Sequence, residues 1–178
     1  MINKTKITVV GSGYVGMSLS VLLSQHNDVT VLEIDSDIVD KINNKISTVA
    51  DPEIELFLSE KDLNLSATLD KHEAYEGACF VIVATPTNYD AENNYFDTSS
   101  VDNVVRDVLE INSEAYVVIK STIPVGHTKL LQEKYSTNRI LFSPEFLREG
   151  QALKDNLYPS RIIVGSQIKA AKTFAKIL

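Results

Sequence analysis

The chain alternates between short runs that are almost wholly apolar and longer stretches in which apolar residues recur at helical spacing. The apolar runs predict strands at 7–10, 29–34, 65–69, 80–84, 116–119, 139–142 and 161–164. The helical spacing predicts helices at 15–23, 38–46, 53–58, 101–111, 128–135 and 168–178. The polar, turn-rich stretch 88–100 is predicted to be a loop.

Apolar strands that are each followed by a helix predict a parallel sheet covered by helices on both faces. We therefore expect an α/β fold of one domain, a doubly wound and mainly parallel sheet of Rossmann-like type. Pro86, Pro124 and Pro144 each follow a predicted strand. Because ligands of such sheets bind beyond the carboxyl ends of the strands, polar residues near these prolines are expected to gather on one edge.

Composition narrows the class of function. The 17 Lys and Arg residues against 24 Asp and Glu give a net charge of −7, which argues against general binding to nucleic acid. No apolar run approaches the ~18 residues of a membrane span, so we expect no membrane contact. Cys79 is the only cysteine, which excludes an intrachain disulfide and favours the cytoplasm. Because it lies beside the apolar run 80–84, we expect a buried thiol. The three histidines are too far apart for metal-ligand spacing, so no metal is expected.

Three of the seven glycines fall within six residues, in the string Gly11-Ser12-Gly13-Tyr14-Val15-Gly16. The string follows a predicted strand and opens a predicted helix, which is the context of a dinucleotide-binding turn. Gly11 would permit the tight turn, Gly13 the approach of a pyrophosphate, and Gly16 the close packing of helix on strand. A plain tight turn is the alternative interpretation.

An acidic residue about twenty positions further on completes this fingerprint. Glu33 lies 22 residues after Gly11 and can accept hydrogen bonds from ribose hydroxyls. It would repel a 2′-phosphate, which favours NAD over NADP. Asp35 is the competing candidate, and Glu33 could instead be a solvated strand end.

Four further motifs carry a resemblance to a known family. They are Ala84-Thr-Pro-Thr-Asn88, Asn94-Tyr-Phe-Asp-Thr98, Lys120-Ser-Thr-Ile-Pro124 and Ser143-Pro-Glu-Phe-Leu-Arg-Glu-Gly150. With the glycine string they closely resemble the UDP-glucose 6-dehydrogenase family over essentially the whole chain. The resemblance implies oxidation of UDP-glucose to UDP-glucuronate with two NAD, through a thioester bound to the enzyme. A related UDP-N-acetyl-sugar dehydrogenase is an alternative.

The resemblance also implies roles for individual residues. Thr122 would lie near the nicotinamide and help to place the hydrolytic water, and Glu145 would be the base of the hydrolysis step. Those expected to bind NAD are Gly11, Ser12, Gly13, Tyr14, Val15, Gly16, Glu33, Thr87, Thr122 and Glu149. Those expected to line the nucleotide-sugar site are Glu145, Phe146, Leu147, Arg148 and Glu149.

Simpler interpretations stay open for the two catalytic candidates. Thr122 could cap the following helix, and Glu145 could be an acid in a first helical turn after Pro144. Position 33 carries Glu where the family usually has Asp, and position 38 carries Ile where many members have a basic residue. Both differences would weaken NAD binding modestly.

The family's nucleophilic cysteine, central dimer helix and UDP-binding second domain lie beyond the region that residues 1–178 resemble. Cys79 does not match that cysteine. We therefore expect residues 1–178 to be an NAD-binding domain, inactive alone, whose partners are UDP-glucose and a missing C-terminal domain. The full-length family forms homodimers. A non-catalytic dinucleotide-binding module that acts with a partner chain is the second hypothesis.

Overall fold

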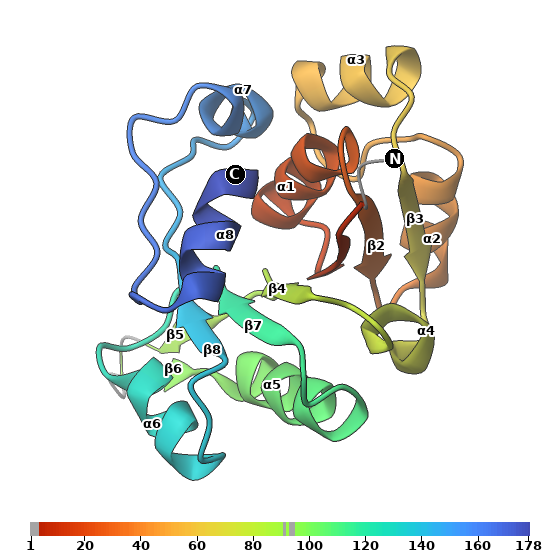
Figure 1. Cartoon of the computed structure of the whole chain (residues 1–178). Helices are drawn as coiled ribbons and strands as arrows, with labels where there is room; N and C mark the ends of the chain where they lie inside the picture. Colours follow the sequence, from red (N-terminus) through yellow and green to blue (C-terminus); the bar gives the residue numbers. More distant parts are fainter. Residues whose placement is uncertain (1–3, 91, 93–94) are drawn as a thin grey trace.

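The computed structural model describes residues 4–90, 92 and 95–178 (Figure 1). Its centre is a parallel sheet of six strands in the order β3-β2-β1-β4-β7-β8. The strands are β1 (Lys6–Val10), β2 (Asp28–Leu32), β3 (Leu65–Thr68), β4 (Phe80–Val83), β7 (Tyr116–Ile119) and β8 (Ile140–Phe142). This order confirms the predicted doubly wound, Rossmann-like fold of one domain.

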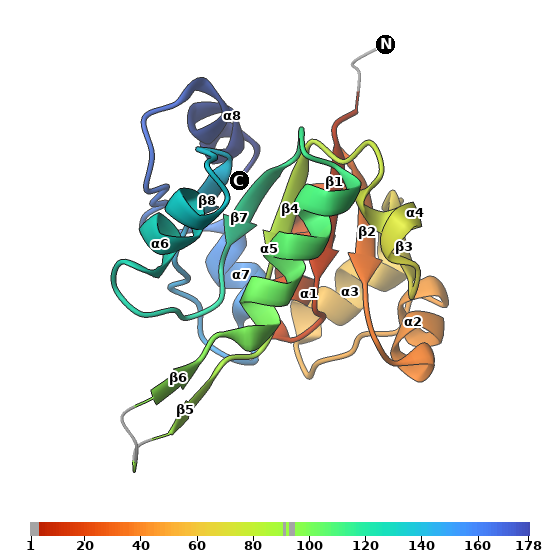
Figure 2. The same ribbon diagram turned by 90° about the horizontal axis from the view of Figure 1, so that it is seen from below.

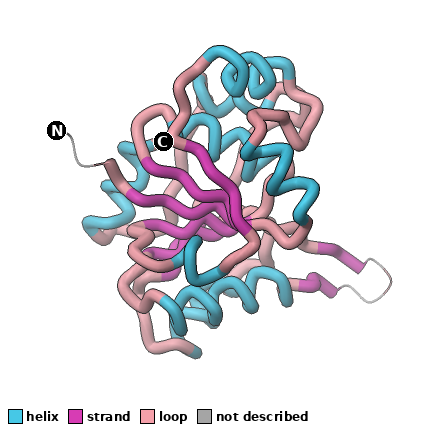
Figure 3. The backbone as a smooth tube through the Cα atoms, turned by 90° about the vertical axis from the view of Figure 1, so that its right-hand side faces the viewer, coloured by secondary structure: helices cyan, strands magenta, loops and turns pink. Residues whose placement is uncertain are grey.

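Helices lie on both faces of this sheet, so the strands form the middle layer (Figure 3). The helices are α1 (Tyr14–Ser24), α2 (Ser36–Asn43), α3 (Pro52–Glu60), α4 (Lys71–Tyr75), α5 (Ser99–Ile111), α6 (His127–Lys134), α7 (Ala152–Leu157) and α8 (Lys169–Ile177). The short helices α4 and α7 have no counterpart among the predicted elements. The six predicted helices are all present, with ends that differ by a few residues.

Strand β4 shows why the apolar runs are continuous. Its four residues are all buried, and they alternate between two cores. Val81 and Val83 pack with residues of α4, α5 and α6, whereas Phe80 and Ile82 pack with residues of α1 and α8. A strand covered on both faces needs apolar side chains at every position, because successive side chains point to opposite faces.

Two predictions of local structure are wrong. Within 88–100, β5 (Asn88–Asp90) and β6 (Tyr95–Asp97) pair as an antiparallel hairpin that projects from the body of the molecule (Figure 2). Tyr89 and Phe96 stack across it with ring centroids 4.9 Å apart, which stabilises the pairing. Asn94, the first residue of the motif at 94–98, lies outside the described residues. Residues 161–164 form no strand, and the bond from Gly165 N to Phe142 O at 2.8 Å is an isolated contact with β8.

The prediction of a buried Cys79 is also wrong, because its side chain is exposed. Cys79 immediately precedes β4, and its amide donates to Lys6 O at 2.9 Å. The backbone thus joins the sheet at the amino end of the strands, where the side chain still reaches solvent. No helix in the described part of the chain is both long and apolar enough to cross a membrane.

Asp51 joins two helices through a carboxylate that is 1% exposed. Its Oδ1 accepts from the amides of Glu53 at 3.1 Å and Ile54 at 3.2 Å, which caps α3. Its Oδ2 accepts from Leu153 N at 3.3 Å, in the first turn of α7. The segment that follows the last strand of the sheet is therefore tied to a helix about one hundred residues earlier in the chain.

We expect Asp51→Ala to lower the free energy of unfolding by about 2 kcal/mol, because it leaves three amides, two of them buried, without an acceptor. Asp70→Ala is the matched control, since Asp70 caps α4 in the same way but is exposed. Its cost should be about 1 kcal/mol or less. Urea unfolding measures the free energy of unfolding of both variants. Equal losses in the two variants would contradict a stabilising role for the contact between Asp51 and α7.

Candidate functional site

The turn between β1 and α1 is shaped by two glycines that the protein itself requires. Gly11 has a φ of +92°, and a Cβ there would lie 2.8 Å from Ala84 O. A Cβ on Gly16 would lie 1.9 Å from Gly11 O. Strand, turn and helix therefore meet through backbone atoms alone, as predicted for these two positions.

Gly13 differs from both, because a Cβ placed on it would have no heavy atom within 4 Å. It has an ordinary φ of −68° and is the N-cap of α1, with no side-chain cap and no acidic residue in the first turn. The first amides of this helix of 11 residues are thus available to an anion, and the helix dipole favours one. The residues present fit a diphosphate at this place.

Glu33 lies directly beside the glycine turn. Its Oε1 accepts from Ser12 N at 2.6 Å and its Oε2 from Ile34 N at 3.2 Å. The carboxylate of Asp35 instead accepts from Asp37 N at 2.9 Å and caps α2. Of the two candidate acids, Glu33 is therefore the one in contact with the turn. Thr48, which no motif in the sequence marks, also holds the turn by donating to Ser12 O at 2.6 Å.

The loops that follow β4 and β7 meet at the carboxyl edge of the sheet. Ser121 Oγ donates to Thr85 O at 2.6 Å, which joins the two loops next to the glycine turn. Thr87 is half-buried there and Thr122 is exposed. Thr122 caps no helix, because α6 begins at His127 with Gly126 as its N-cap. A helix-capping role for Thr122 is therefore excluded. Thr122 lies at the edge where the cofactor is expected, and its role in binding NAD stays a prediction.

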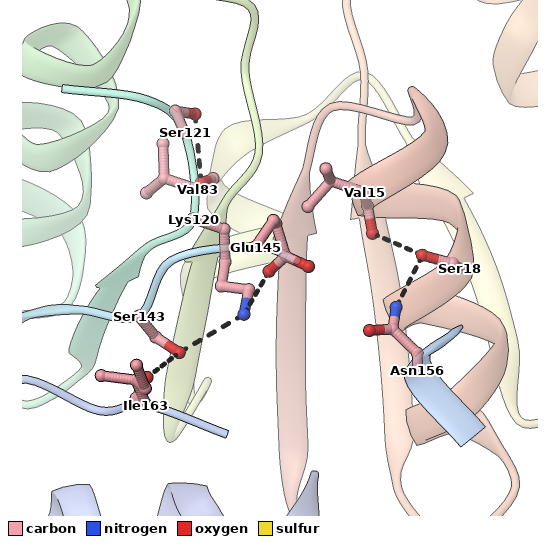
Figure 4. Close-up of polar contacts among 9 residues, drawn as sticks. All are labelled: Val15, Ser18, Val83, Lys120, Ser121, Ser143, Glu145, Asn156 and Ile163. Carbon is pink, nitrogen blue, oxygen red and sulfur yellow. Dashed lines mark hydrogen bonds and ion pairs between the residues drawn. The ribbon is translucent and has the colours of Figure 1, made fainter. Parts of the chain in front are cut away.

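Glu145 lies in an irregular segment after β8, so the alternative of a first-turn helical acid is also excluded. Its Oε1 forms an ion pair with Lys120 Nζ, and the two side chains are 15% and 5% exposed. Lys120 Nζ also donates to Ser143 Oγ at 3.3 Å, as Figure 4 shows. Burial lowers the pKa of the Lys120 ammonium group to about 8.

This ion pair borders a cavity of about 280 Å³ between α1 and the segment after β8. The residues that line it are Leu19, Leu22, Lys120, Ser143, Pro144, Glu145, Phe146, Leu147, Arg148, Asp155, Asn156, Tyr158, Pro159, Ser160, Arg161, Ile162, Ile163 and Leu178. Residues 11–16 and Glu33 thus form one group at the glycine turn, and residues 145–148 form a second group at this cavity. Thr87 and Thr122 lie in the loops that follow β4 and β7. Glu149 is exposed and belongs to neither group.

Two arginines that line the cavity contact other side chains of the protein. Arg148 contacts Asp155 through its amide at 2.9 Å, Nε at 3.0 Å and Nη2 at 2.7 Å. These hydrogen bonds lower the pKa of Asp155 to about 2. The guanidinium carbon of Arg161 lies 4.0 Å from the ring centroid of Phe146. Among residues 4–90, 92 and 95–178, no cluster of His, Cys, Asp or Glu could hold a metal ion.

The six-stranded parallel sheet and its glycine turn define a Rossmann-like dinucleotide-binding domain. A sequence model of the NAD binding domain of the UDP-glucose/GDP-mannose dehydrogenase family matches residues 5–178. The chain belongs to this family.

The chain corresponds to less than half the length of the relatives that it matches. The chain is 52% identical over 179 residues to the UDP-glucose 6-dehydrogenase of Streptococcus pneumoniae and 47% identical over 174 residues to that of Campylobacter jejuni. Each alignment covers 97% of this chain but only 45% and 44% of the relative. A solved UDP-glucose dehydrogenase from Pyrobaculum islandicum has a TM-score of 0.84 and 26% identity, over 98% of this chain and 44% of that one.

We expect Gly16→Ala to lower the free energy of unfolding by about 3 kcal/mol or more, because the new methyl group would overlap the Gly11 carbonyl. Gly13→Ala is the control and should cost about 1 kcal/mol or less, since its methyl group enters open space. Urea unfolding of both variants is the measurement. A Gly16→Ala chain as stable as Gly13→Ala would contradict the packing described for the turn.

Proposed function

We propose that this chain is the NAD-binding half of a UDP-glucose 6-dehydrogenase, which oxidises UDP-glucose to UDP-glucuronate with two NAD. The observation that carries the proposal is the open turn at Gly13, with the Glu33 carboxylate bound to the neighbouring Ser12 amide. The identity of 52% to a UDP-glucose 6-dehydrogenase supports the choice of sugar nucleotide.

In this proposal the amides at the start of α1 bind the pyrophosphate and Glu33 binds the adenosine ribose. Thr122 lies near the nicotinamide, and Thr87 and Glu149 contact NAD. Bound NAD supplies the acceptor for the hydride that leaves C6 of the sugar. The protein's contribution is to bind and orient, because hydride transfer itself is the cofactor's chemistry.

The cavity beside Glu145 takes the nucleotide sugar, with Phe146, Leu147 and Arg148 in its lining. Glu145 acts as the base that accepts a proton from water in the hydrolysis step, and Thr122 helps to place that water. A C-terminal domain supplies the nucleophilic cysteine and the rest of the sugar site. The complete protein acts in the cytoplasm as a homodimer.

Glu33→Ala is expected to weaken NAD binding about tenfold, because the ribose loses a charged acceptor. The ratio of NAD affinity to NADP affinity should be smaller in this variant than in the wild-type chain, because the carboxylate that repels a 2′-phosphate is gone. Calorimetric titration with both dinucleotides measures these effects. Asp35→Ala is the matched control, because it removes a neighbouring carboxylate that caps α2 and should leave NAD affinity unchanged. Failure of the wild-type chain to bind NAD would refute the proposed function.

The full reaction is tested by mixing this chain with the separately produced C-terminal half of the Streptococcus pneumoniae relative. We expect NADH to form with UDP-glucose, because the two halves together supply cofactor site, base and cysteine. Formation only with a UDP-N-acetyl sugar would favour the related dehydrogenase. Binding of NAD without turnover on any sugar nucleotide would favour a non-catalytic dinucleotide-binding module.

A further inference from the structure

Lys120 is a lysine whose charged end lies inside the protein. Its side chain is 5% exposed, and it directly follows the last residue of β7. A buried ammonium group needs hydrogen-bond acceptors, because burial has removed its water. Lys120 Nζ forms an ion pair with Oε1 of Glu145 and donates a hydrogen bond to Oγ of Ser143 at 3.3 Å.

Ser143 sets the direction of these hydrogen bonds. Its hydroxyl donates to the carbonyl oxygen of Ile163 at 2.8 Å, so its single proton is used. Only lone pairs remain on Oγ, and Lys120 is therefore the donor in the contact between them. With Ser143 on one side and Glu145 on the other, the position of the ammonium group is fixed from two directions (Figure 4).

The backbone holds Lys120 and Ser143 more firmly than it holds Glu145. Lys120 N donates to Val83 O at 2.9 Å and Ser143 N to Ile119 O at 3.0 Å, so both residues continue the hydrogen bonding of the sheet beyond β7 and β8. Glu145 comes two residues later, in the irregular segment. The ion pair with Lys120 therefore links its carboxylate to the sheet.

We propose that Lys120 is a positioning residue for Glu145, whose ammonium group holds one carboxylate oxygen, keeps the carboxylate ionised and leaves the other oxygen free to accept a proton. The catalytic meaning of this arrangement rests on the proposed function, in which Glu145 is the base. Figure 4 shows the second oxygen turned away from Lys120, to the side of α1. Leu19 of α1 and Glu145 line the same cavity, from which a water molecule would reach that oxygen.

Other charged groups at the cavity are engaged elsewhere. Arg148 and Asp155 are paired, with Nη2 and Oδ1 2.7 Å apart, so their charges largely offset each other. Arg161 lies over the ring of Phe146. Of the charged residues that line the cavity in the described part of the chain, Lys120 is the one in contact with the Glu145 carboxylate.

The test is a titration of the Glu145 carboxyl carbon by ¹³C NMR in the 178-residue chain, with the resonance assigned through Glu145→Gln. In Lys120→Met, which removes the charge and retains an apolar stem, the pKa of Glu145 should rise by about one unit or more. Lys154→Met is the matched control, because it removes an exposed ammonium group next to Asp155 and should leave the pKa of Glu145 unchanged. An unchanged pKa in Lys120→Met would overturn the proposal.

A second measurement covers the case in which Lys120→Met does not fold. In the wild-type chain, the Lys120 Cε resonance should shift with the same midpoint as the Glu145 carboxyl carbon, because the two groups are in contact. A Lys120 resonance that does not follow Glu145 would equally overturn the proposal. Neither readout involves NAD, so a chain that shows the coupling but binds no NAD would refute the proposed function alone.

Discussion

The close approach of backbone to backbone at the start of α1 fixes how the first strand, the glycine turn and the helix are arranged. A Cβ on Gly16 would stand 1.9 Å from the Gly11 carbonyl oxygen, and one on Gly11 would stand 2.8 Å from that of Ala84. Strands β1 and β4 and helix α1 can therefore meet without intervening side chains. This contact points the amino end of α1 at the carboxyl edge of the sheet, where its free amides attract a phosphate.

The residues around that edge show how neighbouring parallel strands assemble a site. Thr85 and Ser121 follow β4 and β7 and are joined by a hydrogen bond of 2.6 Å. Lys120 and Ser143 follow β7 and β8 and share the bond at 3.3 Å that supports Glu145. Each pair combines residues that are distant in sequence but adjacent because the strands before them are paired. Proposed cofactor and sugar sites thus lie on adjoining parts of one edge.

The segment after β8 is less regular than the sheet and is anchored differently. Asp51 binds it through Leu153 N, and Asn156 Nδ2 donates to Ser18 Oγ of α1 at 2.8 Å. These contacts hold one wall of the cavity against α1 while leaving Ile162 and Ile163 more than 40% exposed. The chain spans about 45% of the length of the curated relatives it matches, and in the proposed function a C-terminal domain supplies the rest of the sugar site.

The sheet, its principal helices and the glycine turn could all be predicted from the order of residues. Each of these depends on a local pattern: unbroken apolar runs for strands covered on both faces, helical spacing for amphipathic helices, and glycines where Gly11 and Gly16 leave no room for a side chain. The choice of Glu33 over Asp35 was left open by spacing. The tertiary structure placed Glu33 against Ser12 and used Asp35 to cap α2.

Four features depend on the folded chain: the pairing of β5 with β6, the exposure of Cys79, the irregular course of 161–164 and the ion pair of Lys120 with Glu145. An apolar run such as 161–164 becomes a strand only if a neighbour offers a ladder of hydrogen bonds, whereas the backbone bond between this segment and β8 is made by Gly165, just after the run. Likewise, nothing local marks Lys120 as buried or paired. Its partner follows a different strand, and only the pairing of β7 with β8 brings the two charges together.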